Sequence, residues 1–136
     1  MYKRILIPVD FTDKNLAALD QVYQIAKWSH GSVTLLHVIE QVENIPSKEL
    51  KQFYQKLEKN ARAKMNQYAK TFAEHSIPVT EKIIYGKRAE EIVRCAVEDD
   101  VEVIVVSSHK VDAPQGWGTL SYKVAILSPC PVLLVK

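Results

Sequence analysis

The chain has 136 residues, of which 47% are hydrophobic and 25% charged, a balance typical of a globular protein that buries its own core. Its 18 Lys and Arg residues nearly cancel its 16 Asp and Glu residues, so the net charge of +2 favours neither nucleic acid nor a membrane surface as partner. The two cysteines lie far apart without CxxC spacing, which excludes a disulfide scaffold and fits a reducing cytoplasm. We expect one domain over residues 1–136 and no membrane span.

Hydrophobic patterning predicts five strands that alternate with four helices. The strands are mostly continuous runs of β-branched residues and Leu, which is typical of strands covered on both faces. The helices show apolar residues at steps of three and four. In chain order the predicted elements are strand 4–10, a helix from Thr12 or Asp13 with a left-handed stop at Gly31, strand 32–39, a long helix from about Ser47 through Phe72, strand 79–85, a helix after Gly86, strand 101–107, a helix from Thr119 to about Leu127, and strand 132–135.

The alternation of strands and helices predicts an α/β fold with an open parallel sheet and helices on both faces. The third strand alternates more in polarity, so we expect it near an edge. Ligands of such sheets bind outside the carboxyl ends of the strands, where the strand order reverses. The residues that leave those ends, such as Asp10 and the stretch 107–119, are therefore the candidates for a site.

The sequence lacks the two common phosphate-binding motifs but contains one other candidate for a phosphate contact. No GxxxxGK[ST] and no GxGxxG follows the first strand, which removes support for P-loop phosphoryl transfer and for hydride transfer to a dinucleotide. Gly118 and Thr119 stand at a predicted helix start, where backbone N–H groups and the helix dipole favour an anion. Ordinary turn and cap chemistry explains the same pair, so the spacing alone leaves both interpretations open.

Several segments, taken in order, resemble the universal stress protein family. They are KRILIPVDFT, VTLLHVI, GKRAEEIVRCA, VEVIVVSSH and GTLSYKVAILSPCPVLLVK, and together they span nearly the whole chain. The resemblance implies a five-stranded parallel sheet of order 3-2-1-4-5, a cytoplasmic homodimer and, in many members, a site for ATP or AMP.

The resemblance also implies roles for particular residues. Pro8 and Val9 would lie along the adenosine, Asp10 by the ribose and the metal-linked phosphate water, and Val38 would offer backbone groups to the adenine edge. Asp10 could instead cap the first helix. Mg²⁺ would accompany ATP, whereas the four histidines show no ligand spacing, so no structural metal is expected.

One part of the family pattern is altered. The nucleotide-binding branch resembles G-x2-G-x9-G-[ST] after the fourth strand, and Gly118 and Thr119 match its last pair. Ser107 and Lys110 occupy the two earlier glycine positions, and the gap from Lys110 to Gly118 is two residues shorter than the pattern. Lys110 could neutralise a phosphate or fill the space that the ligand needs.

Two functions therefore remain in view. One is a cytoplasmic regulatory protein that binds adenine nucleotide weakly at the ends of the first and fourth strands. The alternative is a dimeric interaction module of the same fold whose site has decayed. No nucleophile or general-base constellation is readable, so we expect no enzyme, although a slow ATPase stays conceivable. The homodimer would form through the apolar edge strand of Val132, Leu133, Leu134 and Val135.

Overall fold

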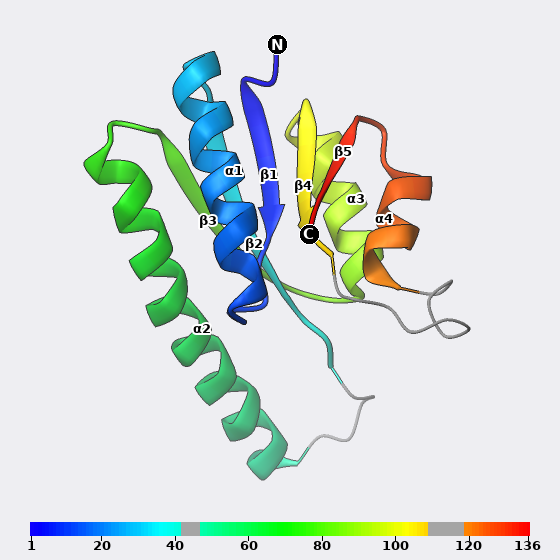
Figure 1. Cartoon of the computed structure of the whole chain (residues 1–136). Coiled ribbons are helices and arrows are strands. Elements are labelled where there is room, and N and C mark those ends of the chain that lie inside the picture. Colours follow the sequence, from blue (N-terminus) through cyan, green and yellow to red (C-terminus); the bar gives the residue numbers. More distant parts are fainter. Residues whose placement is uncertain (42–46, 109–118) are drawn as a thin grey trace.

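A five-stranded parallel sheet forms the centre of the computed structural model, which describes residues 1–41, 47–108 and 119–136 (Figure 1). The strand order β3-β2-β1-β4-β5 confirms the predicted fold class and places the third strand at an edge. The strands are β1 (Arg4–Pro8), β2 (Ser32–Ile39), β3 (Val79–Tyr85), β4 (Val103–Ser107) and β5 (Val132–Val135). The helices are α1 (Lys14–Ser29), α2 (Lys48–Glu74), α3 (Arg88–Glu98) and α4 (Leu120–Leu127).

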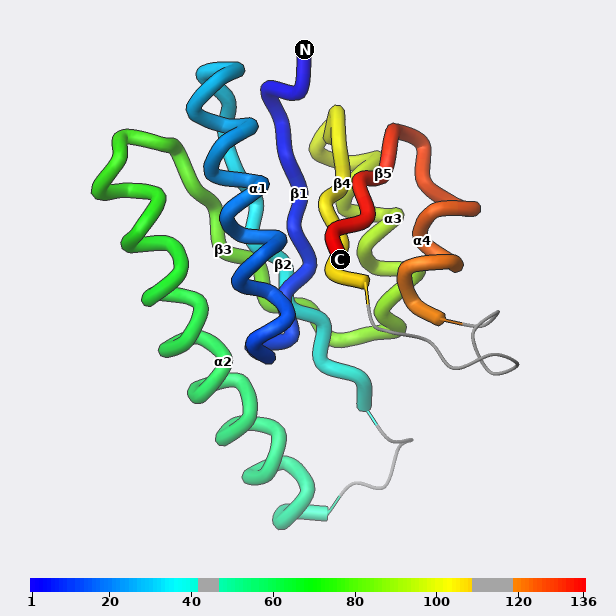
Figure 2. Tube along the Cα trace, viewed as in Figure 1, coloured from blue at the N-terminus to red at the C-terminus, as the bar shows by residue number. Residues whose placement is uncertain are grey.

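Helices cover both faces of the sheet. Helices α1 and α2 lie on one face, and α3 and α4 lie on the other (Figure 2). Successive residues of β1 point to opposite faces: Ile5 and Ile7 are buried with residues of α1 and α2, and Leu6 with residues of α3 and α4. Burial on both faces explains why the strands are continuous apolar runs.

Two strands are shorter than predicted because their flanking backbone groups bond elsewhere. Strand β1 ends at Pro8, since the N–H groups of Asp10 and Phe11 donate to a side chain instead of to a neighbouring strand. Strand β4 begins at Val103, because the Val101 N–H donates to the Ala96 carbonyl and closes the end of α3. In both cases the residues predicted as strand belong instead to the turn next to the strand end.

The ends of α1 differ from the prediction. Asp13 precedes the helix but its side chain makes no cap hydrogen bond, and His30, not Gly31, adopts the left-handed conformation with φ 56°. Gly31 is required for another reason: a Cβ there would lie 2.6 Å from the Lys3 carbonyl oxygen. The Ser47 and Thr119 side chains accept from the first turns of α2 and α4, as their positions predict.

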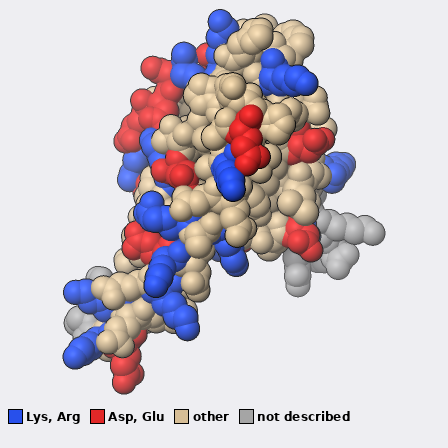
Figure 3. All heavy atoms as spheres, turned by 90° about the vertical axis from the view of Figure 1, so that its left-hand side faces the viewer, with Lys and Arg blue, Asp and Glu red and all other residues tan. Residues whose placement is uncertain are grey.

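Helix α2 is 27 residues long, and all of its buried residues lie in its second half. Its buried residues are Ala61, Met65, Ala69 and Phe72. The first half extends past the edge of the sheet (Figure 1). Lys and Arg side chains gather on this projecting part (Figure 3), where residues 48–59 contain four Lys and two Glu. No helix among the described residues is long and apolar enough to cross a membrane.

Candidate functional site

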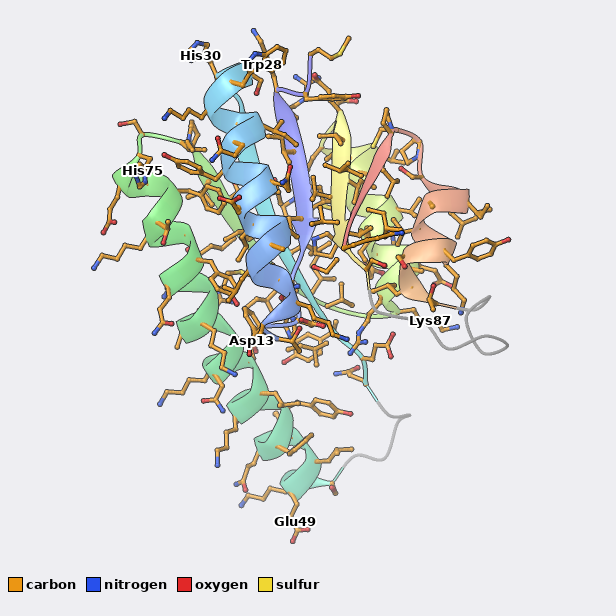
Figure 4. The ribbon with its side chains drawn as sticks, viewed as in Figure 1. Asp13, Trp28, His30, Glu49, His75 and Lys87 are labelled. Atoms are coloured by element: carbon orange, nitrogen blue, oxygen red, sulfur yellow. The ribbon has the colours of Figure 1, made fainter. Side chains whose placement is uncertain are left out.

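The candidate site lies where the strand order of the sheet reverses. Strand β1 is flanked by β2 on one side and by β4 on the other, and the helices that follow β1 and β4 lie on opposite faces. The start of α1 at Asp13 and the start of α3 at Lys87 lie toward the carboxyl ends of the strands, whereas Trp28 and His30 lie at the opposite end (Figure 4). Open parallel sheets bind ligands at this position.

A cavity of about 320 Å³ opens between the ends of these strands. It gathers residues that are distant in the sequence, from β1, β2, β4 and the start of α4. Six of the eight site residues implied by the resemblance line it: Pro8, Val9, Asp10, Val38, Ser107 and Thr119. The other two, Lys110 and Gly118, lie outside the described residues.

One wall of the cavity is apolar. Leu36 and Val38 of β2 and Ile92 of α3 belong to the same buried cluster, and all three line the cavity. Such a wall can hold the flat face of an aromatic ring by excluding water from it. The polar groups are supplied by the turns that follow β1 and β4.

Asp10 does not cap α1, because Asp13 stands at the N-cap position, but its carboxylate bonds within the turn that precedes this helix. Its Oδ1 accepts hydrogen bonds from the Thr12 backbone N–H at 3.0 Å and from the Thr12 hydroxyl at 2.7 Å, so the carboxylate stabilises the turn that leads into α1. The same residue lines the cavity. The pKa of the Tyr68 hydroxyl is raised above its usual value, mainly because the group is partly buried. The negative charges of Asp10 and Asp13 raise it further.

Asn15 is a polar residue of the site that the sequence patterning missed. Its side-chain oxygen accepts from the backbone N–H groups of Asp10 and Phe11, both at 2.8 Å, and its Nδ2 donates to the Ser107 Oγ at 3.2 Å. Asn15 is 3% exposed. The sequence does contain a signal for it: Asn15 has the helical spacing that places it on the same buried face of α1 as Ala18 and Val22.

Two further residues, Arg88 and His37, also line the cavity. Arg88, the first residue of α3, is the one Lys or Arg among the described residues that line the cavity, and its backbone N–H donates to Glu40. Its signal in the sequence was the run GKR after the third strand.

The His37 Nδ1 lies 2.7 Å from the Val9 carbonyl oxygen, and this contact joins β2 to the end of β1. Among the described residues no three His, Cys, Asp or Glu side chains group as metal ligands.

The model of the universal stress protein family matches residues 1–136. The universal stress protein YxiE of Bacillus subtilis is 26% identical over 148 aligned residues, covering 100% of both chains. The universal stress protein MJ0577 of Methanocaldococcus jannaschii is 32% identical, covering 100% of this chain and 96% of the relative, and its solved structure gives a TM-score of 0.88.

A universal stress protein family protein from Arabidopsis thaliana, solved with AMP bound, has the same fold. Its TM-score is 0.74 at 17% identity, and the match covers 98% of this chain and 91% of that one. The full-length family match and the 32% identity to a relative of nearly equal length lead to one conclusion. This chain belongs to the universal stress protein family.

Proposed function

We propose that this protein is a regulatory member of its family that binds adenine nucleotide weakly in the cavity at the ends of β1 and β4. The observation that carries the proposal is the gathering of six residues, from Pro8 to Thr119, around one cavity at the point where the strand order reverses. The Arabidopsis relative has AMP bound on this fold, which supports an adenine nucleotide as the class of ligand.

The lining suggests how a nucleotide would lie. The adenine would contact the apolar wall of Leu36, Val38 and Ile92, and the ribose would lie beside Asp10. The phosphates would extend toward Thr119, where the first N–H groups of α4 favour negative charge. By resemblance, Lys110 and Gly118 would add to the phosphate end. Asp10 is the carboxylate that fits a Mg²⁺ ion carried by ATP.

Phosphate recognition should be weaker than in the glycine-rich branch of the family. Glycine lets a backbone N–H approach a phosphate oxygen without a side chain between them, and Ser107 and Lys110 replace two such glycines. Each charge-assisted hydrogen bond contributes roughly 1.5–3 kcal/mol, so one lost contact lowers affinity about tenfold to a hundredfold. We therefore expect ATP and AMP to bind with similar, modest affinity.

Calorimetry of the purified protein with ATP, ADP and AMP tests this function. A second measurement denatures the protein and analyses the supernatant by ion exchange for a nucleotide carried through purification. Ser32→Ala, at the opposite end of the sheet, is the control variant and should bind like the wild type. Tight ATP binding with strong preference over AMP would contradict the weak phosphate contact, and no binding at all would contradict the function.

The alternative function is a dimeric interaction module that keeps the fold without binding nucleotide. The altered glycine positions at Ser107 and Lys110 favour it. It predicts that no adenine nucleotide binds while the dimer forms normally, so the same calorimetry combined with light scattering separates the two functions. Neither proposal requires hydrolysis of the nucleotide.

The proposed homodimer forms through β5. This strand pairs with β4 on one side and lies at the edge of the sheet, and Leu133 and Leu134 are 38% and 44% exposed. An apolar edge strand leaves backbone groups that a symmetry-related copy can pair. We also propose a cytoplasmic location, which fits the free thiols of Cys95 and Cys130.

A further inference from the structure

A second cavity lies between α1 and α2, which cover the same face of the sheet (Figure 2). Its volume is about 390 Å³, within the range of roughly 300–1,000 Å³ that is typical of small-molecule pockets. Residues of α1 from Leu16 to Tyr23 and residues of α2 from Tyr68 to His75 line it, at steps of one, three and four. None of these described residues lines the cavity at the ends of β1 and β4, so the two cavities are separate.

Aromatic rings make up much of the lining. Phe72 forms the buried side, because it is 3% exposed and belongs to the core. At one end the Tyr23 ring of α1 packs edge-on against the His75 ring of α2, with the ring centroids 5.0 Å apart. Tyr68 lines the cavity toward its other end. A ligand with an apolar body would therefore contact aromatic rings and the core at the same time.

The charge around this cavity is negative. The exposed carboxylate of Asp20 lines it, whereas no Lys or Arg among the described residues does. Burial raises the pKa of Tyr68, and the charges of Asp10 and Asp13 raise it further, so their negative potential reaches the cavity as well. A positively charged ligand is therefore favoured here over an anion.

A neighbouring ring already holds a cation. The Lys64 Nζ lies 5.8 Å from the centroid of the Phe11 ring, and this ring in turn lies 5.8 Å from the Tyr68 ring. Tyr23 offers the same kind of ring at the opposite end of the cavity, three residues after Asp20 and next to it on the helix surface. A ligand ammonium beside these two residues would gain a cation–π contact and a charge–charge attraction together.

We infer that the cavity between α1 and α2 binds a small organic cation, an amine that carries one aromatic ring system. Asp20 and Tyr23 hold the charged group, and Tyr68 and Phe72 contact the ring system. The lining residues of each helix extend over about 10 Å along its axis, which matches a ring system with a short amine chain. This binding is independent of the proposed nucleotide function, since it uses a different cavity.

Calorimetry with three indoles that differ in charge tests the inference. Tryptamine carries an ammonium on a short chain, tryptophol a neutral hydroxyl and indole-3-acetate a carboxylate. The wild type should bind tryptamine about fivefold to twentyfold more tightly than tryptophol, and indole-3-acetate more weakly than either. Asp20→Asn removes the charge and should bring the ratio of tryptamine to tryptophol affinity down to about twofold. Tyr23→Leu keeps an apolar side chain without the ring and should lower the same ratio about threefold.

The ratio of affinities separates recognition of the charge from a general loss of structure, since a disturbed cavity would weaken tryptamine and tryptophol alike. Glu49→Gln removes a negative charge at the far end of α2 from His75 (Figure 4) and should keep the wild-type ratio. Excess AMP should not displace tryptamine, because the two cavities share no described lining residue.

Four results would overturn the inference: no binding of tryptamine, equal binding of tryptamine and tryptophol, a ratio that both Asp20→Asn and Tyr23→Leu leave unchanged, or displacement of tryptamine by AMP. The last result would place the indole in the nucleotide cavity. Calorimetry with AMP alone tests the proposed function, which therefore stands or fails separately from all four.

Discussion

Replacing Asp10 with Asn separates its structural role from its proposed contact with the ligand. The Asp10 Oδ1 accepts two hydrogen bonds from Thr12, at 3.0 and 2.7 Å, and an Asn side chain keeps an oxygen in this position. The expected loss is the charge-assisted part of these bonds and the favourable charge near the start of α1, together about 1 kcal/mol. Asp10→Ala removes the acceptor of both hydrogen bonds and should lower the free energy of unfolding by roughly 1–3 kcal/mol.

The two variants should differ in affinity as well. A carboxylate bond to a ribose hydroxyl is about twice as strong as its neutral counterpart, so Asp10→Asn should weaken AMP binding about fivefold. Asp10→Ala loses the whole bond, which corresponds to about a tenfold to a hundredfold loss. Both variants should also move the pKa of Tyr68 down toward its usual value, because the Asp10 charge contributes to raising it.

Urea unfolding, calorimetry with AMP and an NMR titration of Tyr68 measure the three effects. Asp20→Asn, an exposed position of α1, is the matched control and should leave AMP binding unchanged. Undiminished affinity in Asp10→Ala would refute the placement of the ribose beside this carboxylate. A loss of more than about 2 kcal/mol in Asp10→Asn would show that the fold itself requires the charge.

Three further outcomes are expected. Leu134→Asp places a charge on the exposed edge strand and should yield a monomer by light scattering at micromolar concentration, and a persisting dimer would rule out β5 as the interface. Gly31→Ala brings a Cβ to 2.6 Å from the Lys3 carbonyl oxygen and should lower the free energy of unfolding by about 1–3 kcal/mol, so an unchanged urea midpoint would contradict this close approach. Asp99 pairs with Lys82 at 2.6 Å, and this hydrogen bond is the main cause that lowers the pKa of Asp99 from 3.8. The wild type should therefore be more stable than Asp99→Asn by about 0.5–1 kcal/mol at pH 7, and the difference should vanish as the pH falls below 3.8 through the lowered pKa; a difference that persists at pH 2 would refute it.

Much of the fold could be predicted because the pattern is local and repeated. The apolar runs and the helical steps of three and four gave the nature and order of the elements, and right-handed crossovers limit their arrangement. The exact ends were less predictable, because they depend on partners distant in sequence. His30 takes the left-handed position, while Gly31 is required by the close backbone of Lys3, the residue before β1.

The candidate site could be predicted in part for the same reason. Asp10 and Ser107 follow strands, so their place at the sheet edge follows from the topology. The bond from Asn15 to Ser107 joins residues 92 positions apart, and no local pattern indicates it. A polar residue in phase with a buried helix face, such as Asn15, is the signal that could have found it.

The uneven burial along α2 has a consequence for its exchange with solvent. The half that contains Met65 and Phe72 is anchored in the core, so its amide hydrogens should exchange with deuterium only when the whole fold opens. Residues 48–60 contain no buried position, and an isolated helix of that length is marginal in water. Their helical state therefore depends on continuation from the anchored half, on the Ser47 cap and on the contacts of Tyr54 and Glu58 with Tyr85 of β3. Amide exchange and tryptic cleavage at Lys51 and Lys56 should proceed there through local fraying, long before the sheet unfolds.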